Sequence, residues 1–82
     1  MKVRILLREA REKKGLNYSQ MAKALKLSAH TPYLLIETCK REGTLETWKR
    51  IQKVLEIKDS KMWETITTFK YVENPKKPNK IE

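Results

Sequence analysis

Apolar residues recur at helical spacing in five short stretches of the chain, and charged residues fill most of the positions between them. The first stretch predicts a helix from Lys2 to Lys14, which ends before Gly15. The second stretch predicts a helix from Tyr18 to about Lys26, which is capped by the side chain of Asn17. Both stretches have one apolar face, so each helix is expected to pack against a shared core.

Two further helices are predicted in the middle of the chain. Thr31 is the expected N-cap of the third helix, and Pro32 is its first helical residue, where the missing N–H costs nothing. This helix runs through Glu37 and can continue to Glu42, where Gly43 would end it as a C-cap. The fourth helix is capped by Thr44, and its apolar face contains Leu45, Trp48, Ile51, Val54 and Leu55.

The rest of the chain predicts a fifth helix and a tail. The helix covers residues 60–68 with Asp59 or Ser60 as its cap, and its inward side chains are expected to be Met62, Trp63, Ile66 and Phe69. Residues 65–72 (TITTFKYV) alternate and are rich in β-branched side chains, so residues 69–72 fit either a helix or a strand. Residues 74–82 (NPKKPNKIE) predict a short mobile basic tail. The expected fold is therefore a compact all-α domain of five helices over residues 1–73, followed by this tail.

The composition adds a strong positive charge to this helical domain. Nineteen Lys and Arg residues stand against ten Asp and Glu in 82 residues, which gives a net charge of +9. A charge of this size in so short a chain indicates an anionic partner, and nucleic acid is the commonest one.

The sequence offers no residue set for catalysis or for a cofactor. Cys39 and His30 are the only cysteine and histidine, so neither an internal disulfide nor a His/Cys metal site is expected. Cys39 is expected to be a small buried or half-buried side chain and not a nucleophile, because no second catalytic group is specified near it. A protein that is not an enzyme and uses no cofactor or metal is therefore expected. Without a long apolar segment or a signal-peptide pattern, its expected location is the cytoplasm, with no membrane partner.

Three blocks of the sequence, taken in order, resemble the Cro/cI-type (XRE-family) helix-turn-helix DNA-binding domain. The first block, LREAREKKGL at residues 7–16, is similar to that family's first helix and turn. The second, AKALKLS at residues 22–28, is similar to the end of its second helix and the tight turn. The third, IETCKREGTLETWKRIQKVLEI at residues 36–57, is similar to the end of its recognition helix, the basic loop and the fourth helix. The resemblance implies a lambda-repressor-like fold and a transcription regulator of phage or mobile-element type, which binds palindromic duplex DNA as a homodimer.

The resemblance also implies roles for individual residues. Arg11 and Glu37 match the positions at which family members join the first helix to the end of the third by an ion pair, and two solvated surface charges are the alternative. The implied DNA contacts are Asn17, Tyr18, Ser19, Ser28, Ala29, His30, Thr31, Leu34, Lys40 and Arg41. The implied dimer interface contains Trp63, Ile66, Phe69 and Tyr71.

The chain departs from the family pattern around the implied recognition helix. The segment between Ser28 and Ile36 is one residue longer than usual, which favours a longer turn and a helix that begins at Thr31 and Pro32. Tyr18 stands where many members have a Gln, so we expect its hydroxyl to donate to a phosphate instead of reading a base. His30 then lies at the front of the recognition helix, where contact with DNA and simple exposure are equally expected.

The implied base-reading positions are unusually apolar, because they hold Ala29, Leu34 and Leu35. Ala29 can contact a thymine methyl group. The two leucines are explained either by burial in the shifted helix or by a surface that docks another protein. The second explanation gives an alternative function, in which Tyr33, Leu34 and Leu35 of a small interaction module bind a partner protein. Binding to single-stranded RNA is not favoured, because exposed aromatic residues for stacking are not evident.

Overall fold

The computed structural model describes residues 1–72, which are mostly helical and include a short two-stranded sheet. The elements follow one another as β1 (Lys2–Arg4), α1 (Ile5–Lys13), α2 (Tyr18–Ala24), α3 (Thr31–Glu37), α4 (Leu45–Leu55), α5 (Asp59–Thr67) and β2 (Phe69–Tyr71). Five helices in this order were predicted, and this part of the prediction is confirmed. The tail predicted for residues 74–82 lies outside the described residues. Within residues 1–72, none of the helices has the length and apolar character needed to cross a bilayer.

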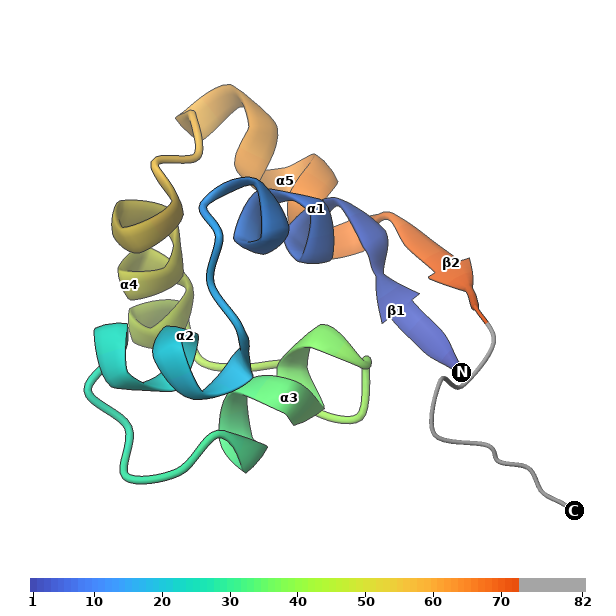
Figure 1. Ribbon diagram of the computed structural model, residues 1–82. Helices are drawn as coiled ribbons and strands as arrows, with labels where there is room; N and C mark the ends of the chain where they lie inside the picture. Colours follow the sequence, from blue (N-terminus) through green and yellow to red (C-terminus); the bar gives the residue numbers. More distant parts are fainter. Residues whose placement is uncertain (73–82) are drawn as a thin grey trace, which may run out of the picture.

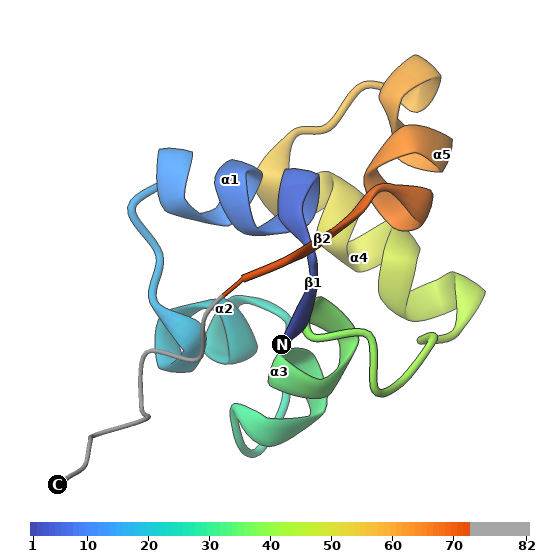
Figure 2. The same cartoon turned by 90° about the vertical axis from the view of Figure 1, so that its right-hand side faces the viewer.

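A two-stranded antiparallel sheet joins the two ends of the described chain (Figures 1 and 2). Its register places Lys2 opposite Tyr71, Val3 opposite Lys70 and Arg4 opposite Phe69. The prediction that the first helix starts at Lys2 was therefore wrong, because residues 2–4 form strand β1. The strand that pairs with them lies at the far end of the chain, so the local spacing of apolar residues carries no sign of it.

The core lies between the helices, and α4 contributes more of its buried side chains than any other helix. The buried apolar side chains that form it are Leu7, Met21, Leu25, Tyr33, Ile36, Trp48, Ile51 and Leu55. Trp48, Ile51 and Leu55 repeat at spacings of three and four, so they form one continuous face of α4. The predicted cap of this helix is confirmed, because the Thr44 hydroxyl accepts the N–H of Thr47 at 3.1 Å.

The helices α2 and α3 both end earlier than predicted. α2 ends at Ala24, and Lys26 takes the left-handed conformation (φ 62°) that turns the chain toward α3. α3 ends at Glu37, because Cys39 takes the same conformation (φ 62°) two residues later. The prediction that α3 continues to a Gly43 cap was therefore wrong. Cys39 is half-buried, as expected.

The start of α3 differs from the prediction by one residue. His30 is the N-cap, Thr31 is the first helical residue and Pro32 is the second. No side chain caps this end, so the predicted Thr31 cap is not formed. The proline still lies in the first turn, where its missing N–H breaks no helical hydrogen bond.

α5 turns a different face inward from the one expected. It buries the side of the helix that carries Met62, Thr65 and Ile66, whose spacings of three and four define one face. Trp63 then points outward and is 76% exposed. Phe69 belongs to β2 and is 44% exposed. The expected inward positions of Trp63 and Phe69 were therefore wrong, and the expected Asp59 or Ser60 cap is absent because Lys58 precedes the helix without a side-chain cap.

Candidate nucleic-acid interface

The C-terminal end of α3 is anchored inside the domain by an ion pair with α1. The buried Arg11 donates from Nε to Glu37 Oε1 at 2.9 Å and from Nη2 to Oε2 at 3.3 Å. Its Nη1 also donates to the carbonyl of Leu16 at 2.6 Å. The pair that the family resemblance implied is thus present, and Glu37 is 0% exposed. A two-point contact of this kind fixes the orientation of both side chains.

Two tyrosines and a second arginine complete the surroundings of the Glu37 carboxylate. Tyr33 donates its hydroxyl proton to Oε1 at 2.8 Å, and Tyr18 donates its own to Oε2 at 2.8 Å. Arg8 Nε lies 3.7 Å from Oε2. The hydroxyl proton of Tyr18 is therefore used inside the domain, which is a correction to the phosphate contact expected of it. The docking surface suggested for α3 likewise loses Tyr33, which is 0% exposed.

The same contacts shift the ionisation of the cluster. Burial raises the pKa of Tyr33, and the charge and hydrogen bond of Glu37 raise it further. Burial also raises the pKa of Tyr18, with the hydrogen bond to Glu37 as the next cause. Burial by itself lowers the pKa of Arg11, but the hydrogen bond and charge of Glu37 outweigh it, so the pKa is raised. Both tyrosines therefore remain neutral donors and Arg11 remains a cation at neutral pH.

Arg4 is a second buried arginine, and sequence reasoning missed it. Its Nε donates to the carbonyl of Ile66 at 2.9 Å, and its Nη1 donates to the carbonyls of Ile36 and Arg41. The guanidinium also lies over the Trp48 ring, 5.5 Å from its centroid. Arg4 thus ties strand β1 to the end of α3, to the basic loop and to α5. The sequence carried no signal for this role, because Arg4 stands among other charged residues at the start of the chain.

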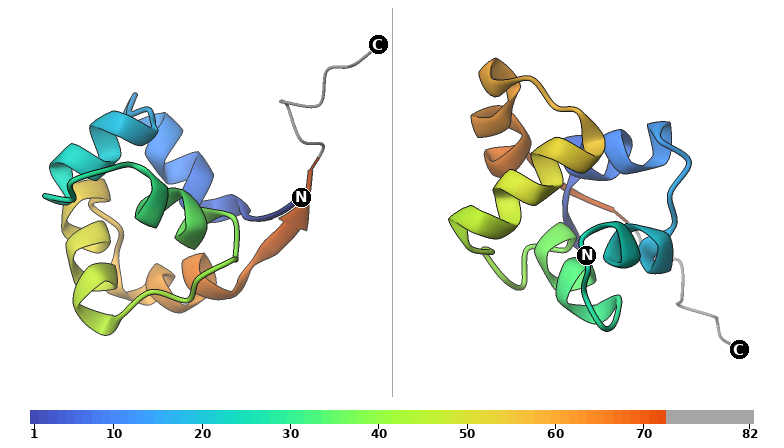
Figure 3. Two further views of the ribbon diagram at one scale, coloured as in Figure 1. Left: turned by 90° about the horizontal axis from the view of Figure 1, so that it is seen from below. Right: turned by 90° about the vertical axis from the view of Figure 1, so that its left-hand side faces the viewer.

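The N-terminal end of α3 and the turn before it are exposed. Ser28, Ala29, His30 and Thr31 all face solvent. The connection from α2 to α3 lies at the edge of the molecule, away from α5 (Figures 1 and 3). α2 packs against α3, so the turn is held by two helices although its own side chains are free.

A hollow of about 320 Å³ connects α2 with this exposed turn. Its lining contains four of the predicted DNA contacts, namely Ser19, Ser28, Ala29 and His30. Lys23, which was not among the predicted contacts, also lines the hollow and is exposed. Lys23 lies one helical turn after Ser19, so the sequence already indicated that both side chains share one face of α2. The hollow therefore gathers hydroxyl, imidazole and ammonium groups, which can donate hydrogen bonds to an anion or a base edge.

Positive charge surrounds α3 but does not lie on it. Residues 13–36 contain four lysines and no Asp or Glu. α3 itself contains neither Lys nor Arg, while Lys40 and Arg41 follow it and are exposed. A polyanion that approaches the turn therefore meets lysines on the α2 side and the basic pair on the other side.

Two other predicted contacts have structural roles. Asn17 Oδ1 accepts the N–H of Gln20 at 2.8 Å, and Gln20 Oε1 accepts the N–H of Asn17 at 2.9 Å. This capping box confirms Asn17 as the cap of α2 and occupies its side chain. Leu34 and Leu35 are both half-buried, so each presents only part of its apolar side chain to solvent.

The residues expected at a dimer interface are largely exposed. Trp63 and Tyr71 are 76% and 77% exposed. The ammonium group of Lys2 lies over the Phe69 ring, 4.4 Å from its centroid. Ile66 is half-buried and packs against the core. Exposed aromatic side chains are thus present, although none was evident from the sequence as a stacking residue for single-stranded RNA.

Comparison with known proteins adds no further information about this interface. The chain matches no family model, no curated protein and no solved structure.

Proposed function

We propose that the chain is a duplex-DNA-binding regulator with a lambda-repressor-like helix-turn-helix, in which α2 and α3 are the two helices and α3 is the recognition helix. The observation that carries this proposal is the exposed turn of residues 28–31, held between two packed helices in a stretch of sequence without carboxylates. A rigid projecting turn with donors at its tip has the shape and chemistry that the major groove accepts.

The contacts follow from the position of each group. His30 and Thr31 donate or accept hydrogen bonds at base edges, and Ala29 contacts a thymine methyl group. Ser19 and Lys23 bind phosphates on the α2 side of the groove, and Lys40 and Arg41 bind them on the other side. Asn17 supports this arrangement through its cap.

The functional unit of this proposal is a homodimer on a palindromic site. Trp63, Phe69 and Tyr71 support it, because a second copy would cover these exposed aromatic rings. A two-fold axis between two copies places their recognition helices about one helical turn of DNA apart.

Equilibrium binding at rising salt concentration tests the proposal. A palindrome is first selected from a random pool of duplexes at near-physiological salt, and the labelled duplex is then titrated by fluorescence anisotropy. The logarithm of the affinity is expected to fall linearly with the logarithm of salt concentration, and Lys40→Ala/Arg41→Ala should reduce the slope by about two.

The matched control is Lys49→Ala/Lys53→Ala, which removes the same charge from exposed positions on α4. Its slope should equal that of the unmodified protein. A flat salt dependence, or the same loss in both double variants, would contradict the proposal.

The interaction module is the second candidate, and the burial of Tyr33 weakens it. Its remaining residues are the half-buried Leu34 and Leu35. Leu34→Asp separates the two functions when protein is captured from nuclease-treated lysate. A stoichiometric protein partner that is lost in this variant, without retained DNA, would favour the module.

A further inference from the structure

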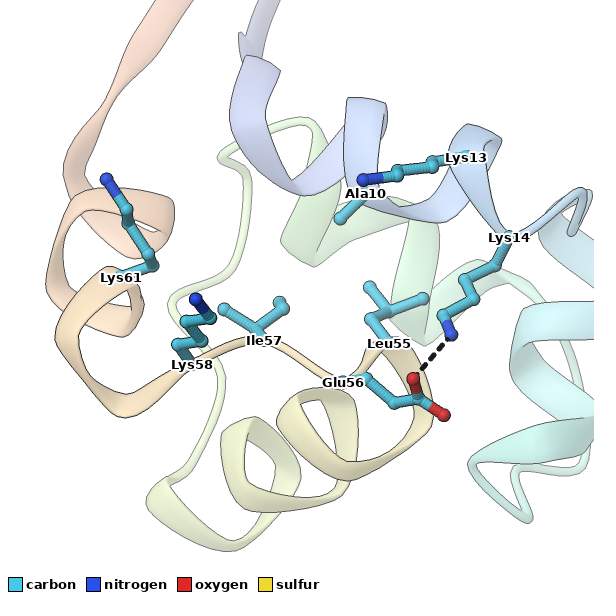
Figure 4. A pocket seen from close by; sticks show the side chains of 8 residues that line it. All are labelled: Ala10, Lys13, Lys14, Leu55, Glu56, Ile57, Lys58 and Lys61. Atoms are coloured by element: carbon cyan, nitrogen blue, oxygen red, sulfur yellow. Dashed lines mark ion pairs between the residues drawn. The ribbon is translucent and has the colours of Figure 1, made fainter.

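A second recess lies on a part of the surface formed by α1, the connection from α4 to α5, and α5. Its volume is about 440 Å³, and it shares no lining residue with the hollow at the α2–α3 turn. The floor is apolar and contains Ala10, Leu55 and Ile57. Four lysines surround this floor (Figure 4). We call it the lysine trough.

The lysines stand on both sides of the apolar floor. Lys13 ends α1 and Lys14 follows it, whereas Lys58 directly precedes α5 and Lys61 lies in its first turn (Figure 4). Leu55 and Ile57 lie between the two pairs (Figure 4). A ligand that satisfies this arrangement must carry negative charge on both sides of an apolar group.

Part of this charge is already balanced within the trough. Lys14 Nζ lies 2.9 Å from the carboxylate of Glu56, which within residues 1–72 is the only acidic residue that lines the trough. Lys61 Nζ lies 3.7 Å from Glu64 outside the lining, and both side chains are more than half exposed, so this pair is weak. The lining therefore keeps an excess of three positive charges, with Lys13 and Lys58 contributing on opposite sides.

We propose that the lysine trough binds an acidic segment of a partner protein, in which one aliphatic side chain is flanked by carboxylates. The aliphatic side chain covers Leu55 and Ile57, and the carboxylates pair with Lys13 on one side and with Lys58 and Lys61 on the other. Apolar burial at the centre with charges at the rim is the usual anatomy of a protein interface.

Nucleic acid fits this trough less well than an acidic peptide does. The apolar floor offers nothing to a sugar–phosphate backbone, and among the described residues no arginine lines the trough to bind a phosphate at two points. The carboxylate of Glu56 repels a continuous line of phosphates, whereas separate carboxylates can avoid it. The inference does not depend on DNA binding at the α2–α3 turn.

Binding of short labelled peptides, measured by fluorescence anisotropy, tests the proposal. The probe carries one leucine flanked on each side by two glutamates. One control peptide replaces the leucine with serine, and the other replaces the glutamates with glutamine. The probe is expected to bind, and both control peptides should bind about tenfold more weakly, because each lacks one of the two complementary features.

Two protein variants of equal charge identify where the peptide binds. Lys58→Glu/Lys61→Glu should weaken binding of the probe at least about tenfold. Lys49→Glu/Lys53→Glu places the same charge change on α4, outside the trough, and should leave binding of the probe unchanged within about twofold. Thermal melting shows whether both variants are folded.

Several outcomes would overturn the proposal. These are no binding of the probe, equal binding of the three peptides, or equal losses in the two variants. If duplex DNA displaces the peptide from the folded protein, the proposal is also overturned, because the trough would then bind phosphates. The selected duplex should bind Lys58→Glu/Lys61→Glu and Lys49→Glu/Lys53→Glu equally, so failure of the peptide proposal is distinguishable from failure of DNA binding.

Discussion

The two ends of α3 have opposite environments although Thr31 and Glu37 are only six positions apart. At the C-terminal end, Glu37 is enclosed by Arg11, Tyr18 and Tyr33, and the carbonyl of Ile36 accepts a bond from Arg4. At the N-terminal end, Thr31 and the turn before it face solvent, and no side chain caps the helix. One end is fixed by buried charge, while the other end keeps its polar groups free.

The difference shows how a short helix can be both oriented and available for binding. Burying charge is costly, and an ion pair inside a domain is better evidence for positioning than for stability. Here the buried pair sets the direction of α3, and that direction decides where the exposed turn points.

Glu37→Leu is expected to have the largest effect on stability. It leaves the Arg11 cation and two tyrosine hydroxyls buried without their acceptor, so the free energy of unfolding should fall by about 3–5 kcal/mol. Arg11→Met should cost less, because the Glu37 carboxylate keeps both tyrosine donors and can draw closer to Arg8. Urea unfolding at neutral pH measures both values. Equal losses would contradict the central position of Glu37 in the cluster.

Tyr33→Phe removes one donor to Glu37 and keeps the ring in the core. A hydrogen bond to a charged group contributes about 1.5–3 kcal/mol, so a loss of this size is expected at neutral pH. The raised pKa of Tyr33 also means that the folded state holds this proton more tightly than the unfolded state. Its contribution to stability is present below about pH 10 and is lost as the pH rises above that value.

Thermal melting at alkaline pH measures the contribution of the Tyr33 proton to stability. Melting temperatures between pH 8 and pH 11 should fall less in Tyr33→Phe than in the unmodified protein. Tyr71→Phe is the matched control, because Tyr71 is 77% exposed and should change neither the stability nor its pH dependence. Identical alkaline curves for Tyr33→Phe and the unmodified protein would disprove the assigned role of Tyr33.

Arg4→Lys tests the second arginine that holds the C-terminal end of α3. Lysine keeps the charge but cannot direct hydrogen bonds from Nε and Nη1 to three carbonyls at once. We expect a loss of about 1–3 kcal/mol in the free energy of unfolding, measured in urea. Lys2→Arg, a conservative change on the same strand at an exposed position, should be neutral. An unchanged free energy of unfolding in Arg4→Lys would show that Arg4 does not hold this end of α3 in place.

His30→Ala should have the smallest effect on stability and a clear effect on DNA selection. The side chain is exposed and makes no cap bond, so the free energy of unfolding should change by less than about 0.5 kcal/mol. Selection from a random duplex pool should nevertheless yield a site that differs at the position read by His30. If the variant unfolds easily or selects the same site, His30 does not have the proposed role.

The helices were predictable wherever local chemistry determines them. Asn17 and Thr44 cap their helices as expected, because an N-cap needs only one side chain and a backbone N–H two or three residues away. The end of α3 was not predictable, because Cys39 adopts a left-handed conformation that favours glycine. Strand β1 was not predictable either, because its partner is β2 at the other end of the described chain.

The candidate site was predictable in part. The Arg11–Glu37 pair followed from the family resemblance, and the exposure of residues 28–31 agrees with the turn expected there. The hydroxyl bonds of Tyr18 and Tyr33 to Glu37 could not be read from the sequence, because they depend on how α1, α2 and α3 pack. The same reason explains why Arg4 was missed and why Trp63 was placed in the core.

Amide chemical shifts of the labelled protein, recorded while the selected duplex is added, test most directly the proposal that the exposed end of α3 binds DNA. We expect the largest shift changes at Ser19, at residues 28–31 and at Lys40 and Arg41, and small changes on α1 and α5. Changes confined to α1 and α5, with residues 28–31 unaffected, would contradict the proposal.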